Sequence, residues 1–340
     1  MNLHLFYFIL LISLTACKNK PARNVDNNKH PIVAKAPGLD SASLINDLAY
    51  LSSGTLEGRE TGSPGNKIAR DYIVKRYDSL GLKAFNAGRL QEFALRQNRG
   101  VNIIAAVTGT TYPDRYFVLS AHYDHLGIKN GEVYHGADDN ASGTACLLVL
   151  ARYFRQHPPR HSFLFASFDA EEKGLAGSSY FVQHSPVGLN KILLNINMDM
   201  ISRNDKNEIY VAGTRYYPSF KKYIDTVRSH TTVNVLPGHD EPEQGTDDWT
   251  SQSDHYPFHK AHIPFLYFGV EDHPDYHRPT DTFDKIDKGF YYGVCDMIRK
   301  VIEALDRKEE RVTQLLPLRR FHKPALRLPH SSLHLRHSAY

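Results

Sequence analysis

The sequence predicts a three-layer α/β/α sandwich built around a largely parallel, mixed central sheet. Short, continuously apolar segments alternate with longer segments whose apolar residues recur at helical spacing. The apolar segments lack the alternation of a strand with one face in water, so we expect helices on both faces of the sheet. The 340 residues, 41% hydrophobic and 23% charged, suffice for one domain with a sizeable core.

The expected elements follow one another along a single domain at 41–307. Two helices come first, at 41–53 and 63–81; each begins with a serine, and the second ends at Gly81. Strands are expected at 101–109, 116–124, 162–170, 191–202, 208–213 and 263–270. Further helices are expected at 142–157, 174–184, 219–230 and 288–308.

Both ends of the chain differ from this domain. Residues 1–16 contain an apolar run too short for a membrane span and predict a signal peptide. The residues LTAC at 14–17 resemble a bacterial lipobox, which predicts lipid attachment at Cys17, a flexible tether over 17–40 and a membrane-anchored lipoprotein of the bacterial cell envelope. No Lys or Arg precedes the apolar run, so an ordinary secretory signal is the alternative. Residues 308–340 predict a basic, poorly ordered tail.

The net charge and the cysteines exclude some functions. A net charge of +4, partly located in the tail, gives no electrostatic basis for binding nucleic acid. Apart from Cys17, the chain has only Cys146 and Cys295, which lack the spacing of a zinc or redox pair. We expect two buried free thiols, with one disulfide as the alternative.

Acidic and histidine side chains gather where the expected strands end. In an open α/β sheet this edge carries function. The candidates are His122, Asp124, His125, Asp138, Asp139, Glu171, Glu172, Asp199, His273, Tyr276, His277 and Asp281. Acids there could simply stabilise helix N-termini, at about 0.3–1 kcal/mol each. Asp199, however, interrupts an apolar strand, where a carboxylate is costly unless it is paired or binds a cation.

A bound divalent metal would relieve the repulsion among these acids. Imidazole and carboxylate donors without thiolates favour zinc or a close relative. His122 would bind the metal, and Asp124, two residues along the same strand end, would orient its ring.

Five motifs in order resemble the M28 zinc aminopeptidases: SAHYDHLG, GADDNASG, FDAEEKGLAGS, NMDMIS and DYHRPTDT. The preceding segment LEGRETGSPGNKIARDYIV is similar to the N-terminal part of that family. The resemblance implies two co-catalytic zinc ions and removal of N-terminal residues from peptides by a zinc-activated water. The implied partner is a peptide with a free N-terminus.

The same resemblance implies roles for individual residues. His122 and Asp199 would bind one zinc ion, Glu172 and His277 the other, and Asp139 would bridge the two. Glu171 would be the general base and acid, Asp124 would orient His122, and the Tyr276 hydroxyl would support the oxyanion.

Three alternatives remain at this stage. M20 metallopeptidases usually insert a domain between the later ligands, but only 78 residues separate Asp199 from His277. Glutaminyl cyclases also contain the glutamate pair, but tend to place Trp before the ligand histidine, where this chain has Tyr276. A non-catalytic lipoprotein that retains the fold is the third. Asp254 and His255, within 238–259, fit either a cleft-lining or a structural role.

Overall fold

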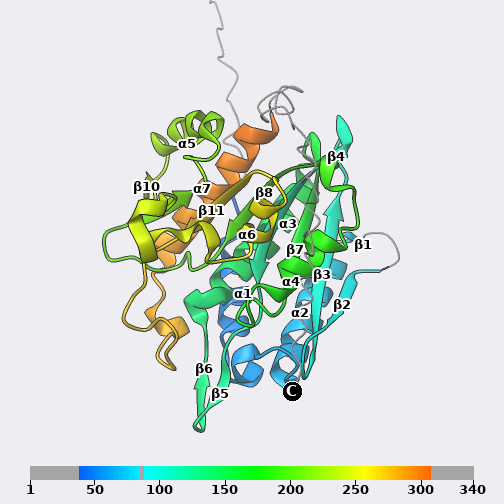
Figure 1. Cartoon of the computed structure of the whole chain (residues 1–340). Helices are drawn as coiled ribbons and strands as arrows, with labels where there is room; N and C mark the ends of the chain where they lie inside the picture. Colours follow the sequence, from blue (N-terminus) through cyan, green and yellow to red (C-terminus); the bar gives the residue numbers. More distant parts are fainter. Residues whose placement is uncertain (1–37, 85–87, 308–340) are drawn as a thin grey trace, which may run out of the picture. The chain divides into compact units, whose positions relative to one another are not determined.

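The computed structural model describes residues 38–84 and 88–307 (Figure 1). All of these residues belong to one unit of the chain, Gly38–Tyr340. The expected signal peptide, the lipidated Cys17, most of the tether and the tail at 308–340 lie outside the described residues. Within the described ranges, no helix is both long and apolar enough to cross a membrane.

A mixed nine-stranded sheet forms the middle layer of the described part of the chain. Its order is β1 (Lys83–Ala84), β3 (Arg99–Val107), β7 (His161–Phe168), β4 (Tyr112–His122), β8 (Ile192–Met198), β11 (Phe265–Gly269), β9 (Glu208–Ala212) and β10 (Asn234–Pro237), while β2 (Leu90–Ala94) also pairs with β3. The four central strands β7, β4, β8 and β11 run parallel. Antiparallel pairing begins on either side, at β3 and β9. The largely parallel, mixed sheet is therefore confirmed.

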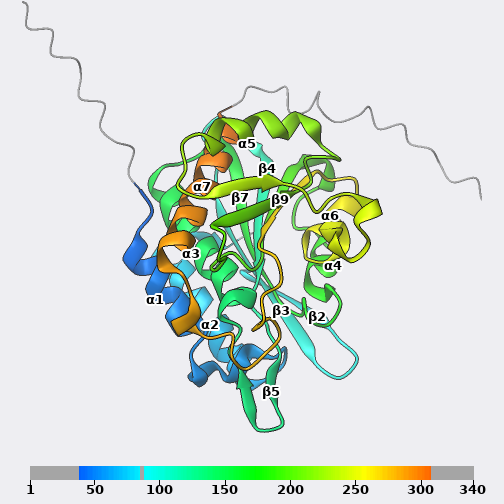
Figure 2. The same cartoon turned by 90° about the vertical axis from the view of Figure 1, so that its left-hand side faces the viewer.

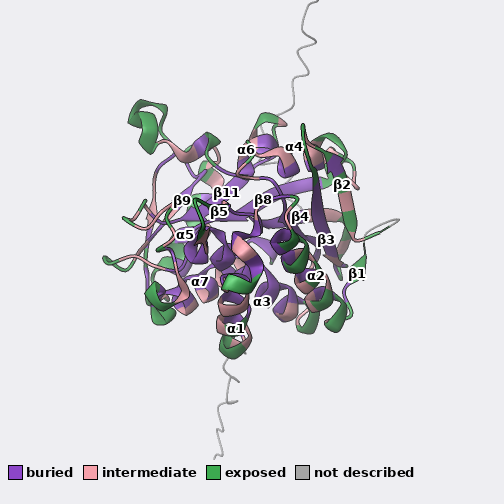
Figure 3. Cartoon of the chain, turned by 90° about the horizontal axis from the view of Figure 1, so that it is seen from below, coloured by how far each residue is buried: buried purple, intermediate pink, exposed green. Residues whose placement is uncertain are grey.

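Helices cover both faces of this sheet, as Figure 2 shows. One face carries α1 (Ser41–Leu51), α2 (Pro64–Ser79), α3 (Gly143–Gln156), α5 (Lys221–Arg228) and α7 (Lys288–Asp306), and the other carries α4 (Ala176–Gln183) and α6 (His255–Lys260). The buried strands explain the two layers. In β7, Phe163 and Phe165 pack into the first core and Leu164 into the second, because successive side chains point to opposite faces. Figure 3 shows the buried sheet between helices whose outer faces are exposed.

Several short elements were not expected from the sequence. They include β1, β2, β10, α6 and a separate hairpin of β5 (Gly127–Lys129) and β6 (Glu132–Tyr134). Short helical turns add η1 (Gly54–Arg59), η2 (Ala137–Ser142), η3 (Leu189–Lys191), η4 (Pro218–Phe220), η5 (Pro242–Asp247), η6 (Trp249–Ser251) and η7 (Phe283–Lys285). These segments have little apolar periodicity. In β2, for example, only Phe93 is buried.

Asp306, the last residue of α7, ties that helix to the start of β7. Asp306 accepts hydrogen bonds from the backbone amides of Arg160 and His161, at 2.7 and 2.9 Å, and contacts the His161 ring at 2.9 Å. We expect Asp306→Ala to lower the free energy of unfolding by about 2–3 kcal/mol, because it leaves buried donors without an acceptor. Chemical denaturation would measure this. Asp225→Ala, at an exposed position of α5, should change the free energy of unfolding by less than about 0.5 kcal/mol. If both variants lowered stability equally, Asp306 would not be the stabilising contact described above.

Candidate metal centre

The candidate site lies at the edge where the parallel strands end. His122 is the last residue of β4, Glu171 and Glu172 follow β7, and Asp199 follows β8 directly. Within the sheet, His122 pairs with Phe168, so the ends of β4 and β7 are level. Asp139 comes from η2, just before α3, and His277 from the loop between β11 and α7. The structure thus brings together all five residues expected to bind metal.

These five residues form two groups that share Asp139. His122 Nε2 lies 3.2 Å from Asp199 Oδ1 and 3.4 Å from Asp139 Oδ1. His277 Nε2 lies 3.1 Å from Asp139 Oδ2 and 3.4 Å from Glu172 Oε2. Each oxygen of Asp139 therefore lies close to a different one of these two histidines, Oδ1 to His122 and Oδ2 to His277.

The donor atoms fit zinc. Tetrahedral bonds of about 2.0–2.1 Å separate neighbouring ligand atoms by roughly 3.3–3.4 Å. The observed separations of 3.1–3.4 Å are close to this value, and all donors are imidazole nitrogens or carboxylate oxygens. The ligand atoms of His122, Glu171 and Asp199 also lie within 4.8 Å of one another, as do those of His125, Asp139 and Glu172.

The adjacent glutamates have different electrostatic surroundings. Burial raises the pKa of Glu171 well above its ordinary value; the charge of His122 opposes this shift and that of Asp199 adds to it. Burial and Asp139 would also raise the pKa of Glu172, but contacts with His125 and His277 lower it to about 2. Glu172 is therefore held as a carboxylate, whereas Glu171 lies where a proton is retained more readily.

Asp124 contacts His122 and also fixes the turn that carries the glutamates. Its backbone oxygen lies 3.2 Å from His122 Nδ1, and its carboxylate is 3.6 Å away. The same carboxylate accepts hydrogen bonds from the amides of Glu171 at 3.1 Å and Glu172 at 3.3 Å, and from the Thr61 hydroxyl at 3.3 Å. Asp124 thus contacts both His122 and the turn of the glutamate pair, and can position the two together.

Two residues that contact the metal-binding groups were given no role from the sequence. His125 is buried, and its Nδ1 lies 2.9 Å from Glu172 Oε1, the oxygen that does not face His277. The Ser253 hydroxyl donates to Asp199 Oδ2 at 2.7 Å, the oxygen that does not face His122. The sequence marked His125 as a candidate because it lies three residues after β4, but the contact of Ser253 depends on how a distant loop folds.

Arg59 fixes the loops beneath the site. Its buried guanidinium donates to the carbonyl oxygens of Tyr123 at 2.9 Å, His135 at 2.7 Å and Gly136 at 2.9 Å, and also to that of Leu51. Burial lowers the pKa of Arg59 to about 10, which leaves it charged at neutral pH. Arg59 thereby joins the segments that carry His122 and Asp139. Arg59 lies in the polar sequence LEGRE, and nothing in this pattern predicted that its side chain would be buried.

Other candidate residues form a structural cluster beside the site. Asp138 accepts hydrogen bonds from the backbone amide and hydroxyl of Ser202, and its other oxygen lies 3.2 Å from His273 Nε2. Asp281 accepts from the backbone amides of Asp138 and Asp139 at 3.0–3.1 Å. These contacts shape the loop that presents Asp139.

Three further candidate side chains differ in their surroundings. The Tyr276 ring stacks on His277 with centroids 3.9 Å apart, and burial together with nearby acids raises the pKa of its hydroxyl. Asp254 is fully buried, and burial raises its pKa to about 7. His255 packs against aromatic rings, and burial lowers its pKa to about 3, which suits a neutral structural histidine.

Comparisons with known proteins agree with this geometry. The family model for peptidase family M28 matches residues 102–302. The chain is 27% identical to aminopeptidase YwaD of Bacillus subtilis over 292 residues, covering 82% of this chain and 60% of the relative. The chain spans about three fifths of the length of the curated relatives it matches.

Solved structures share the fold. A zinc aminopeptidase from Bacillus subtilis, BSAP, superposes with a TM-score of 0.64 at 18% identity, over 82% of this chain and 98% of that one. The glutaminyl cyclase of Bacteroides thetaiotaomicron gives a TM-score of 0.63 at 18% identity, over 81% and 100% of the two chains. The family model covers more than half of this sequence and includes its five ordered motifs. The chain therefore belongs to peptidase family M28.

Proposed function

We propose that the chain is a zinc-dependent exopeptidase, a metallo-aminopeptidase that removes N-terminal residues from peptides. The observation that carries this proposal is the position of Asp139, whose two oxygens face two separate groups, one containing His122 and the other His277. Membership of family M28 supports the same activity, as do relatives named as an aminopeptidase and as zinc metalloproteases.

We assign two zinc ions to these groups. His122, Asp139 and Asp199 would hold one, and Asp139, Glu172 and His277 the other. When bound, zinc polarises the scissile carbonyl group and lowers the pKa of water. The close approach of these carboxylates supports this assignment, because their mutual repulsion needs positive charge to offset it.

The remaining roles fall to side chains around the two groups. Glu171 accepts a proton from the attacking water and delivers it to the leaving amine. The Tyr276 hydroxyl donates a hydrogen bond to the developing oxyanion. Asp124 is a positioning residue, because it contacts His122 and the backbone of the glutamate pair. The carboxylates at this edge of the sheet, the acidic rim of the site, attract the ammonium group of a free N-terminus. This attraction gives exopeptidase specificity.

Glutaminyl cyclase activity is the second candidate, favoured by the similarity to the Bacteroides thetaiotaomicron cyclase fold. It would require one zinc ion and would cyclise N-terminal glutamine. The position of Tyr276 directly before His277 argues against it, as does the complete second group around His122.

We also propose that the protein is an exported lipoprotein of the bacterial cell envelope, anchored at Cys17. This proposal rests on the apolar run and the LTAC residues of the N-terminal segment. Mass spectrometry of the mature protein tests it: diacylglycerol attached to Cys17 supports the anchor, and cleavage without lipid supports the ordinary secretory signal.

Aminoacyl chromogenic amides test the activity directly. We expect the purified protein to hydrolyse leucine p-nitroanilide but not its N-acetylated form, because the acidic rim binds a free amine. A chelator should abolish the activity and added zinc should restore it. Inactivity across a broad set of zinc-loaded dipeptide assays would contradict the proposal. Cyclisation of a glutaminyl peptide, with one zinc per chain, would identify the cyclase instead.

Substitution of the two glutamates separates the base from the ligand. We expect Glu171→Gln to keep its zinc content and lower kcat by about 10²–10⁴-fold, because a carboxamide cannot accept the proton. Glu172→Gln should lose metal first. Atomic absorption and steady-state kinetics on the same samples measure both effects. Near-normal kcat in Glu171→Gln would show that the roles are wrong.

His125 and Ser253 provide a test of the two metal sites separately. Each contacts the outer oxygen of one ligand, Glu172 or Asp199, so its loss should weaken one zinc ion by about 10–100-fold. We expect His125→Ala and Ser253→Ala each to lose one zinc ion per chain under chelator competition, and the double variant to lose both.

His184→Ala, at an exposed histidine after α4, is the matched control and should keep both ions. Unchanged zinc affinity in both single variants would exclude the positioning roles of His125 and Ser253.

A further inference from the structure

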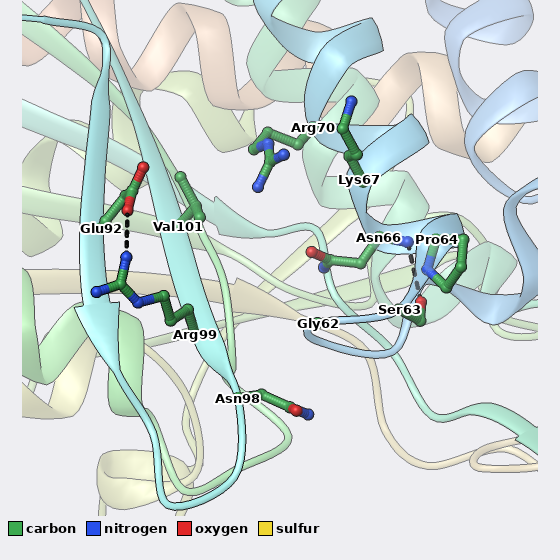
Figure 4. Close-up of a pocket in the computed structure, with 10 residues that line it drawn as sticks. All are labelled: Gly62, Ser63, Pro64, Asn66, Lys67, Arg70, Glu92, Asn98, Arg99 and Val101. Carbon is green, nitrogen blue, oxygen red and sulfur yellow. Dashed lines mark hydrogen bonds and ion pairs between the residues drawn. The ribbon is translucent and has the colours of Figure 1, made fainter.

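A cleft outside the candidate metal centre lies between α2 and the hairpin of β2 and β3, and Figure 4 shows it in close-up. Its volume is about 580 Å³. This volume falls within the range of about 300–1,000 Å³ that is typical of sites for small ligands. None of the ten lining residues belongs to the metal centre, so its ligand would be separate from the zinc groups.

The charged side chains of this cleft are mostly basic. Lys67, Arg70 and Arg99 line it, and Glu92 is the one acid among the lining residues. Lys67 also forms an exposed ion pair with Asp71, which lies on α2 outside the lining. Arg99 pairs with Glu92 at 3.2 Å, with the two side chains 77% and 58% exposed. An exposed pair of this kind is weak, about 0–1 kcal/mol, and a ligand can displace it. The cleft therefore favours a negatively charged ligand.

Arg70 is the basic residue best placed to bind such a ligand. Its side chain is only 20% exposed, and Figure 4 shows it in the gap between α2 and β3. Its Nε is buried and forms an ion pair with the Asp71 carboxylate at 3.7 Å, which is too long for a hydrogen bond. A ligand in the cleft would therefore contact the two terminal nitrogens of the guanidinium. A planar guanidinium in this position suits a carboxylate.

The amide of Asn66 adds a second recognition group. Its Nδ2 donates to the Arg59 carbonyl at 3.2 Å and to Asp169 Oδ1 at 3.0 Å. These bonds use its donor hydrogens, so its carbonyl oxygen is the group that Asn66 can offer to a ligand. An amide carbonyl accepts an N–H group, which peptide backbones supply.

We propose that this cleft binds a peptide segment that carries a carboxylate, with Arg70 contacting the carboxylate and Asn66 accepting a backbone N–H. The inference does not depend on the proposed peptidase activity, because the residues that carry it lie outside the metal centre.

Calorimetric titration of the zinc-loaded protein tests the proposal with acetyl-Ala-Glu-Ala-amide, whose blocked N-terminus cannot serve an aminopeptidase. We expect it to bind at least tenfold more tightly than the Gln analogue. Arg70→Met should weaken that binding at least tenfold, with zinc content unchanged. Glu92→Gln should strengthen it several-fold, because it removes the opposing charge and frees Arg99. Arg228→Met, at an exposed arginine of α5, is the matched control and should bind like the wild type.

Three results would overturn the proposal. One is that the Glu peptide shows no detectable binding, or that neither the wild type nor Glu92→Gln binds the Glu peptide more tightly than the Gln analogue. Another is binding that survives Arg70→Met but is lost in Glu172→Ala, which would place the peptide at the metal centre. The third is inorganic phosphate binding as tightly as the peptide with the same dependence on Arg70, which would identify a site for free oxyanions. Should Arg70→Met fail to fold, the sign of the Glu92→Gln effect still decides.

Discussion

Repulsion among buried carboxylates is the constraint on which this structure depends. Asp124, Asp139 and Asp199 are all buried at the same edge of the sheet, next to Glu172. Two like charges about 4 Å apart repel by roughly 4 kcal/mol at an effective dielectric constant of 20. Imidazole contacts offset part of this repulsion, and the hydrogen bonds that fix each carboxylate offset another part. The zinc ions that we propose for these groups would offset the remainder, so metal binding would be linked to the stability of this edge of the sheet.

The fold holds these charges through backbone contacts as well as side-chain pairs. Parallel strands deliver the residues to one edge, but the loops beyond the strands decide where the oxygens lie. Arg59 binds carbonyl oxygens of two of these loops, while Asp124 and Asp281 each bind two successive amides. Hydrogen bonds to a charged group are stronger than those between neutral groups. The positions of the candidate ligands are therefore maintained by buried charged side chains outside the five residues expected to bind metal.

The sequence predicted the central layers, and it placed acidic and histidine side chains at the ends of the expected strands, because both follow from local patterns. Continuous apolar runs marked β7 and β8, and each run ended in chemically unusual residues such as Asp199. The partners of those residues were harder to predict. Ser253 reaches Asp199 across 54 residues, and Arg59 reaches Gly136 across 77, so neither contact leaves a local pattern. Short edge elements such as β2 were not predicted for a different reason. A half-exposed strand with one buried side chain has almost no apolar period.

The three acids of the DAEE segment have three different tasks. Asp169 does not face the two histidine groups: it accepts hydrogen bonds from Thr61, Asn66, Tyr123 and the Val101 amide. Asn66 and Val101 also line the cleft beside α2, and the Thr61 hydroxyl lies between Asp169 and Asp124. Burial raises the pKa of Asp169 to about 6, so its charge depends on these donors. The end of β7 therefore connects the wall of the basic cleft to the turn of Glu171 and Glu172, and one strand end organises both regions.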